Sequence, residues 1–191
     1  DVEGTYAGMG ASGISLRNAG NLLFLSGGRH PTGGKGSWET VRSFAARHFP
    51  ELPEGYAWAN QDCMTLDGLP YVGLFSPHTP DLYVATGFGA WGMTNSMAAA
   101  TLLADLVQGE KSPYAAVYTP SRSMLRPQLL SNLGHTVSNF LRLTPKRCSH
   151  MGCALKWNPA EHSWDCPCHG SRFTADGSVL DGPAQSRVDL S

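Results

Sequence analysis

The stretch that decides the fold reads Cys-Ser-His-Met-Gly-Cys at 148–153 and Cys-Pro-Cys-His-Gly-Ser-Arg-Phe at 166–173. All but one of the five cysteines of the chain fall in these two segments, together with two histidines. A secreted disulfide scaffold spreads its cysteines along the chain, whereas a short cluster of cysteines mixed with histidines is typical of a metal site. We therefore expect the two segments to form two loops around one metal centre.

Four side chains of this stretch are candidate ligands, in a Cys-x-His and a Cys-x-x-His spacing: Cys148, His150, Cys166 and His169. Two thiolates and two imidazoles are the ligands of a Rieske [2Fe–2S] centre, in which two histidines replace two cysteines on one iron. We expect Cys148 and Cys166 on one iron, and His150 and His169 on the other. The alternative is a structural zinc site, but such sites usually use Cys-x-x-Cys pairs or histidine pairs separated by three to five residues, and they need no further cysteines.

The same stretch resembles the Rieske family, whose ligand loops read C-x-H-x-G-C and C-P-C-H-G-S. Residues 182–184, Gly-Pro-Ala, resemble the proline loop that covers the cluster. The resemblance implies a disulfide between Cys153 and Cys168 that joins the two loops. High-potential relatives place a serine and a tyrosine hydroxyl near the cluster; here the serine is Ser171 and the tyrosine position is Phe173. We therefore expect an intermediate reduction potential, tuned by Ser171.

The cluster-binding module is expected to be minimal and all-β. Residues 144–147 alone separate an expected helix from Cys148. They leave no room for the strands that precede the first ligand loop in respiratory and oxygenase Rieske domains. A module of residues 146–191 buries little core by itself, so we expect it to pack against the preceding domain.

The composition bounds the possible partners. The 191 residues carry 14 Lys and Arg against 15 Asp and Glu, which gives a net charge of −1. Without a basic stripe, a nucleic-acid or anionic-membrane partner is not expected. The chain has no apolar run of the roughly 18 residues that a membrane span needs, and residues 1–4 lack the features of a secretory signal. We expect a cytoplasmic protein.

The hydrophobic pattern ahead of the ligand loops mixes strand and helix periods, which predicts an α+β fold. The expected strands lie within 4–28 and at 56–59, 71–75 and 82–86, and the expected helices at 37–49, 92–107 and 124–141. Ser37 is the expected N-cap of the first helix. The expected domains are a flavoprotein part at 1–122, a helical linker at 123–145 and the cluster module at 146–191.

A glycine-rich turn at 87–92, Gly-Phe-Gly-Ala-Trp-Gly, follows an apolar strand and opens a helix, but no complete dinucleotide-binding unit surrounds it. Together with residues 65–73 and the Ala-rich helix to Asp105, it resembles the C-terminal half of the D-amino-acid-oxidase/glycine-oxidase-like flavoproteins, over about residues 10–122. That family has a mixed sheet with helices and binds FAD, and this turn carries the backbone up to the flavin ring. Glycines permit that approach, and a helix N-terminus offers N–H groups to the ring edge. The implied flavin-facing residues are Gly87, Gly89, Trp91, Gly92, Met93 and Thr94. The alternative is a tight turn without a ligand.

These flavoproteins carry a Rossmann half ahead of the matching region. No such segment occurs in this sequence. We therefore expect the C-terminal fragment of a longer flavin–Rieske fusion, with the missing N-terminal FAD-binding portion as its partner. Alone, the fragment would hold the cluster but bind FAD weakly.

The expected function is that of a flavin-dependent oxidoreductase that passes electrons between FAD and a Rieske cluster while oxidising an amine-like small molecule. The redox partner is not identified, and no catalytic residue can be assigned. Some relatives attach flavin through a cysteine near Cys63, although an ordinary thiol is the alternative; His30 could line the active site. Amino-acid-oxidising relatives often have an arginine where this chain has Gln61-Asp62. The alternative function is electron transfer or redox sensing without substrate turnover.

Overall fold

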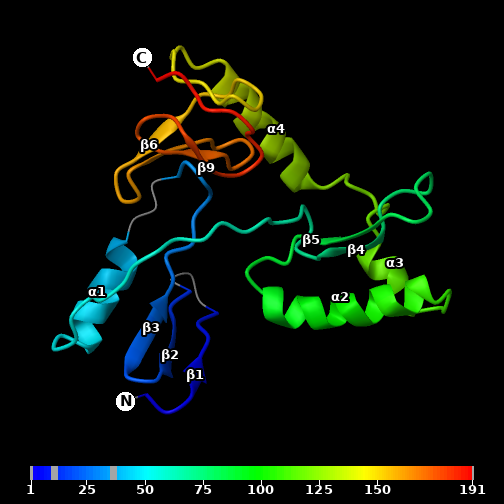
Figure 1. The fold of residues 1–191 in the computed structure, drawn as a ribbon, viewed down its shortest axis with the longest axis horizontal. Helices are drawn as coiled ribbons and strands as arrows, with labels where there is room; N and C mark the ends of the chain where they lie inside the picture. Colours follow the sequence, from blue (N-terminus) through cyan, green and yellow to red (C-terminus); the bar gives the residue numbers. More distant parts are fainter. Residues whose placement is uncertain (1, 10–12, 35–37, 191) are drawn as a thin grey trace. The chain divides into compact units, whose positions relative to one another are not determined.

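The computed structural model of the chain describes residues 2–9, 13–34 and 38–190 (Figure 1). The described residues form two compact units, one drawn from the ranges 1–59 and 136–191 and one from the range 60–135. The expected α+β class is confirmed, because both units combine helices with strands. Every strand pair in the described residues is antiparallel.

The N-terminal segment forms a three-stranded antiparallel sheet in the order β1-β2-β3. Its strands are β1 (Thr5–Tyr6), β2 (Ser15–Ala19) and β3 (Leu22–Ser26). Gly20, with a φ of +59°, closes the tight turn between the last two strands, where a left-handed residue matches the twist of a hairpin. The expected β structure within residues 4–28 is therefore confirmed.

Helix α1 (Glu39–His48) follows, close to the range that the sequence predicts. Its N-cap position is Trp38, without a side-chain capping bond, and the expected cap Ser37 lies outside the described residues. The expected strand at 56–59 is wrong, because this segment has no strand partner. It runs past the N-terminal sheet and packs Trp58 edge-on against Phe24, with 5.9 Å between ring centroids. The alternation of Tyr56 and Trp58 therefore corresponds to one aromatic packing contact and not to strand pairing.

The unit of residues 60–135 is built on a hairpin of β4 (Tyr71–Leu74) and β5 (Tyr83–Thr86). Helix α2 (Gly92–Val107) begins after the glycine-rich turn and packs against β4, so that Val72, Ala99 and Leu102 form a small core. A short helix, α3 (Ala115–Tyr118), lies in the proline-punctuated connection, where four residues are too few to show a helical period. Helix α4 (Pro127–Phe140) leads into the other unit.

The C-terminal module is a four-stranded antiparallel sheet in sequential order, which confirms its expected all-β character. Its strands are β6 (Lys156–Asn158), β7 (Ser163–Asp165), β8 (Arg172–Phe173) and β9 (Val179–Asp181). Phe173 is fully buried in a core that includes Cys148 and Cys166. Beside it, the buried carboxylate of Asp165 accepts hydrogen bonds from Ser163 and Arg172, so the charge inside the module is paired.

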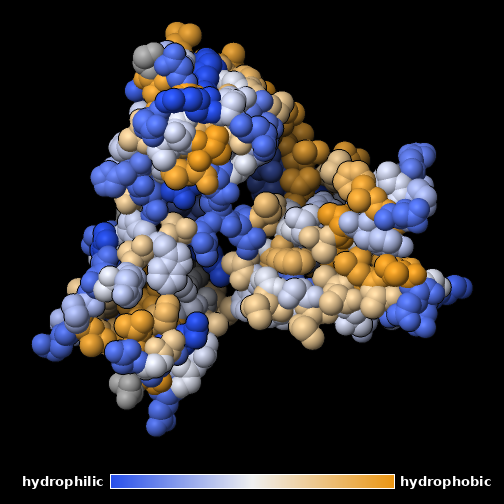
Figure 2. Space-filling view, in the orientation of Figure 1, coloured by the Kyte–Doolittle hydropathy of each residue, from blue (hydrophilic) through white to orange (hydrophobic). Residues whose placement is uncertain are grey.

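Much apolar surface is exposed in both units (Figure 2). Met93 and Met97 on α2 are 87% and 71% exposed, and Leu130 on α4 is 72% exposed. None of the helices in the described ranges combines the length and the apolar composition that crossing a bilayer requires.

Candidate cluster centre and flavin-facing turn

The two ligand segments form loops with the same backbone frame. In the first loop, the N–H of Cys148 donates to the carbonyl of Cys153 (2.8 Å) and the N–H of Gly152 donates back to the carbonyl of Cys148 (2.9 Å). The second loop, residues 166–171, repeats both bonds at equivalent positions, with lengths of 2.8 and 3.0 Å. The fifth residue of each loop is a glycine with positive φ, +76° at Gly152 and +83° at Gly170.

The four predicted ligands lie on these loops as two neighbouring pairs. The thiols of Cys148 and Cys166 are hydrogen-bonded to each other, and the two residues are 3% and 0% exposed. The imidazoles of His150 and His169 face solvent, with ring centroids 5.0 Å apart and planes at 88°. Two sulfur donors therefore sit inside the module and two nitrogen donors at its surface.

Burial controls the protonation of these groups. It raises the pKa of Cys166 to about 11 and raises that of Cys153 further still. Partial burial, together with the neighbouring His150, lowers the pKa of His169. His169 is therefore in its neutral form near pH 7, the form that binds a metal, whereas the buried thiols release their protons only to a compensating cation or by oxidation.

The two remaining cysteines of the stretch lie beside the predicted ligands. The sulfur atoms of Cys153, Cys166 and Cys168 are all within 4.8 Å of one another, and Cys153 is hydrogen-bonded to Cys168. The structure has all of them as free thiols. The disulfide between Cys153 and Cys168 stays a prediction, now with the two sulfurs in adjacent positions.

We expect intact-mass analysis of alkylated, unfolded protein to show three labels, on Cys63, Cys148 and Cys166, and none on Cys153 or Cys168. The disulfide would join the two loops and stabilise the module by about 2–4 kcal/mol. Alkylation after reduction is the control and should label both positions. Labelling of either cysteine without reduction would show that the bond is absent.

Ser171 and the proline loop meet over the second ligand loop. The Ser171 hydroxyl is fully buried and accepts a hydrogen bond from the N–H of Ala184 (3.1 Å). Because Ser171 accepts in this bond, its hydroxyl proton remains available to a second partner. Gly182 leaves no room for a side chain here, since a Cβ would lie 2.5 Å from the Cα of Ser171.

Replacing Ser171 with alanine is expected to lower the reduction potential of a bound cluster by about 65–130 mV. Losing one charge-assisted hydrogen bond removes roughly 1.5–3 kcal/mol of stabilisation from the reduced form. Protein-film voltammetry measures the shift. Ser178→Ala, whose hydroxyl donates to Asp176 instead, is the matched control. Equal potentials in the two variants would exclude a hydrogen bond from Ser171 to the cluster.

The glycine-rich turn is shaped by a neighbouring segment, residues 62–65. The methyl group of Thr65 occupies the space that a Cβ at Gly87 would need, and the sulfur of Met64 lies 3.5 Å from the corresponding point at Gly89. The carboxylate of Asp62 accepts a hydrogen bond from the N–H of Ala90. Gly87 thus has a local packing reason to be glycine, apart from any flavin, whereas Gly89 is favoured by its positive φ of +59°.

The start of α2 is the open part of this turn. Gly92, Met93 and Thr94 are exposed, and the Cβ position of Gly92 has no atom within 4 Å. Trp91 precedes the helix and is 45% exposed. The first N–H groups of a helix have no partner within it. The expected flavin-facing residues therefore divide into two glycines that pack against the chain and four residues that present backbone and side chains to solvent.

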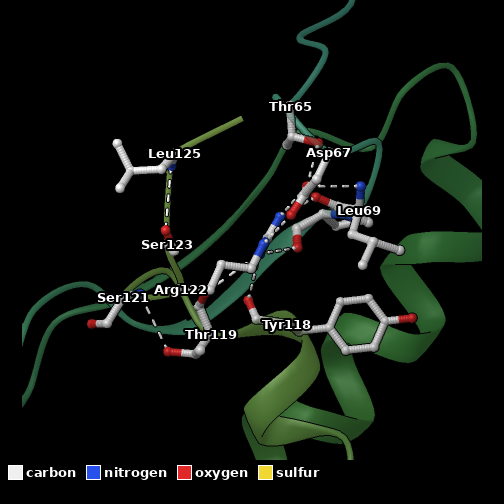
Figure 3. A network of polar contacts seen from close by, with 10 residues as sticks. Thr65, Asp67, Leu69, Tyr118, Thr119, Ser121, Arg122, Ser123 and Leu125 are labelled. Carbon is white, nitrogen blue, oxygen red and sulfur yellow. Dashed lines mark hydrogen bonds and ion pairs between the residues drawn. The ribbon is translucent and has the colours of Figure 1, made fainter. Parts of the chain in front are cut away.

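Sequence reasoning missed the most densely hydrogen-bonded side chain of this unit, Arg122 (Figure 3). Its guanidinium donates to both carboxylate oxygens of Asp67 at 2.7 and 2.8 Å and to the carbonyl of Pro70 at 3.0 Å. It also stacks on Tyr71, 3.8 Å from the ring centroid. The Arg122 guanidinium holds the pKa of the Asp67 carboxyl well below its usual range. The pair fixes the turn at 65–70, which carries residues 62–65 onto the glycine-rich turn.

Cys63 and His30, the other residues that the sequence singles out, are exposed. The carbonyl of Cys63 is 4.0 Å from the Cβ position of Gly87, so the residue belongs to the segment over the turn.

Comparison with protein families agrees with both halves of this description. Residues 4–106, more than half of the chain, match the family model of FAD dependent oxidoreductases, and the chain belongs to that family. Residues 132–190 match the Rieske [2Fe-2S] domain, a match that begins within α4. The cofactors of these two families are FAD and a [2Fe–2S] cluster. The chain is therefore a redox protein that combines the two.

Individual relatives share this combination or its second half. YhfW of Bacillus subtilis, whose name describes a Rieske 2Fe-2S iron-sulfur protein, is 34% identical over 95% of this chain and 46% of its own length. Cytochrome b6-f complex iron-sulfur subunit 3 of Nostoc is 57% identical over 37 residues, 19% of this chain and 21% of that protein. The chain thus spans about half the length of the first and a fifth of the second. No solved structure gives a significant match.

Proposed function

We propose that this chain belongs to an oxidoreductase in which an amine-like small molecule is oxidised at a flavin and the electrons leave singly through a Rieske cluster. The observation that carries the proposal is the pair of matching loops, with two buried sulfurs and two solvent-facing imidazoles, in a chain of the FAD dependent oxidoreductase family. When bound, FAD supplies two-electron acceptance and one-electron release, and the cluster supplies one-electron transfer.

The donor set fits a [2Fe–2S] cluster. Cys148 and Cys166 would hold one iron, and His150 and His169 the other. The sulfur pair excludes water from its side, whereas the imidazoles stay in reach of an electron donor or acceptor. A zinc ion would use the same four ligands but would leave the buried Ser171 hydroxyl without a sulfide to donate to.

On the flavin side, the open start of α2 would bind the electron-rich edge of the ring. The N–H groups of Gly92, Met93 and Thr94 point along the helix axis, whose positive dipole end favours an anion. Trp91 would lie beside the ring, and the Arg122–Asp67 pair would keep residues 62–65 in place behind the turn. We assign this role to the part at 1–122, the linker role to 123–145 and the cluster to 146–191.

An FAD-binding portion of the same oxidoreductase is the partner that we propose for α2. The exposed methionines of α2 form the kind of apolar surface that marks an interaction site on soluble proteins. Such a portion would hold the ADP part of the cofactor, for which the described residues offer no complete dinucleotide-binding unit.

The second candidate function is electron transfer or redox sensing without turnover. It is favoured by Gln61 and Asp62, which stand where amino-acid-oxidising relatives have an arginine, and by the engagement of the Asp62 carboxylate with the N–H of Ala90. A substrate carboxylate would meet a negative charge at this point.

Visible spectra of the whole oxidoreductase, with and without candidate amines, separate the two functions. Turnover predicts that an amine bleaches the flavin band and then the cluster band under anaerobic conditions. Bleaching of both bands by a chemical reductant alone, with every amine inert, would favour the sensing function. A spectrum without a cluster band would contradict both.

A further inference from the structure

The second ligand loop is in contact with a loop of the FAD dependent oxidoreductase part. Gly33 is buried, although residues 29–31 beside it are exposed. A Cβ at Gly33 would lie 2.9 Å from the Cβ of Pro167 and 3.3 Å from its Cα and Cδ. The backbone of this loop therefore rests directly on the proline ring, with no space for a side chain between them.

The conformation of this loop also requires a glycine. The N–H of Gly34 donates to the carbonyl of Pro31 at 2.8 Å, which closes a turn with Gly33 at its third position. Gly33 has a φ of +71°, as this position of a type II turn demands. The loop is thus a preformed surface whose tip faces Pro167.

Pro167 stands between two groups that matter to the cluster. It follows Cys166, a predicted ligand, and it precedes Cys168 and His169, whose N–H groups both donate to the Cys166 sulfur. Hydrogen bonds to cluster sulfurs stabilise the reduced, more negative state and so raise the reduction potential. A shift of Pro167 would move both N–H donors together, because they are the next two residues of the same loop.

The first ligand loop has a support of its own. Arg147 donates to the carbonyl of Arg142 at 2.7 Å, and Gly152 packs against the ring of Phe140 at the end of α4, 3.7 Å from its Cβ position. That support comes from the chain immediately before the module. The support at Gly33 comes from more than 130 positions earlier in the sequence, inside the region that matches the flavoprotein family.

We propose that residues 28–34 form a packing surface that supports the second ligand loop, and that Gly33 is a positioning residue for the cluster. Its contact with Pro167 holds the N–H groups of Cys168 and His169 on the Cys166 sulfur. Through this contact, the flavoprotein part influences the reduction potential of the cluster. This inference rests on the proposed function only in taking the metal centre to be a [2Fe–2S] cluster.

The test compares Gly33→Ala with Gly20→Ala in the whole chain. Both glycines have positive φ, +71° and +59°, so both variants carry the same backbone strain. A Cβ at Gly20 meets no atom within 4 Å, whereas one at Gly33 meets Pro167. We expect the ratio of reduced to oxidised cluster at a fixed potential to fall three- to tenfold in Gly33→Ala alone; tenfold corresponds to 59 mV for one electron. Amide exchange at Cys168 and His169 should quicken at least tenfold.

Pro167→Gly provides a second route, because it removes the ring together with the Cβ that lies 2.9 Å from the Cβ position of Gly33, and it keeps Gly33 itself. If Gly33 acts through Pro167, the shift in the double variant will be smaller than the sum of the two single shifts. An unchanged reduction potential and unchanged amide exchange in Gly33→Ala, or additive shifts in the double variant, would contradict the positioning role of Gly33. Amide exchange can be measured without a cluster, so it tests the positioning role of Gly33 by itself. Failure of the proposed function would appear instead as the absence of an iron signal in the unaltered protein.

Discussion

Protein with His169 replaced by alanine will lose the characteristic low-g EPR signal of the reduced cluster, whereas the unaltered chain will hold two irons and two acid-labile sulfides. The reason lies in the arrangement of the donors. Two imidazoles, with ring centroids 5.0 Å apart, lie at the exposed end of the site, and removal of one would leave an iron with a single protein ligand.

The matched control for this experiment is His162→Asn. His162 is an exposed histidine of the same module with a φ of +51°, a conformation that asparagine tolerates. It should retain full iron content and the same signal. Stoichiometric zinc in anaerobically purified, iron-supplied protein, or an unchanged EPR signal in His169→Ala, would contradict the ligand assignment.

Replacing Arg122 with methionine is expected to cost up to about 3–5 kcal/mol of unfolding free energy, because the largely buried Asp67 carboxylate is left without its charge partner. The side chains of Arg122 and Asp67 are 10% and 12% exposed, so water replaces little of what is lost. Urea denaturation followed by circular dichroism and by tryptophan fluorescence measures the loss.

The pH dependence of this loss has a definite sign. Arg122 holds the pKa of Asp67 below its unfolded value, so the ion pair stabilises the native state above about pH 4 and the contribution disappears as the pH falls through the native pKa. In Arg122→Met the guanidinium no longer lowers the pKa of the Asp67 carboxyl, so that pKa rises toward or above its unfolded value. The stability difference between the two proteins should therefore be largest at neutral pH and shrink on acidification.

Arg42→Met is the control for Arg122→Met. Arg42 donates to both carboxylate oxygens of Glu54 at 2.8 and 2.7 Å, the same bidentate geometry, but the two side chains are 52% and 49% exposed. Exposed pairs are screened by water and salt, so this variant should lose much less stability. Equal losses in the two variants would show that burial of the Arg122 pair is not what makes it matter.

Local signals predicted much of this structure. The helix at 92–107 was expected at its observed bounds, because a glycine-rich turn precedes it and a long Ala- and Leu-rich run follows. The ligand loops could be recognised because their chemistry depends on residues a few positions apart. The strand expected at 56–59 failed because strand pairing requires a neighbour, which an alternating pattern does not supply.

Contacts between distant residues were not predictable in the same way. Arg122 and Asp67 are 55 positions apart, and neither lies in a pattern that selects the other. The contact between Gly33 and Pro167 is even harder to predict from the sequence. A glycine that is needed for close packing cannot be distinguished there from one that is needed for a turn. Both contacts depend on how elements pack, which the order of residues along one element does not reveal.

The two ligand loops share the same backbone hydrogen bonds, so the backbone of the cluster site is approximately two-fold symmetric, but the side chains on the two loops are not. Cysteine opens both loops and glycine is fifth in both, but histidine is third in one, at His150, and fourth in the other, at His169. The sixth positions also differ, with Cys153 in one loop and Ser171 in the other. The two imidazoles therefore leave their loops from non-equivalent points, and a molecule that approaches the module meets two distinguishable edges and not a pair of interchangeable ones.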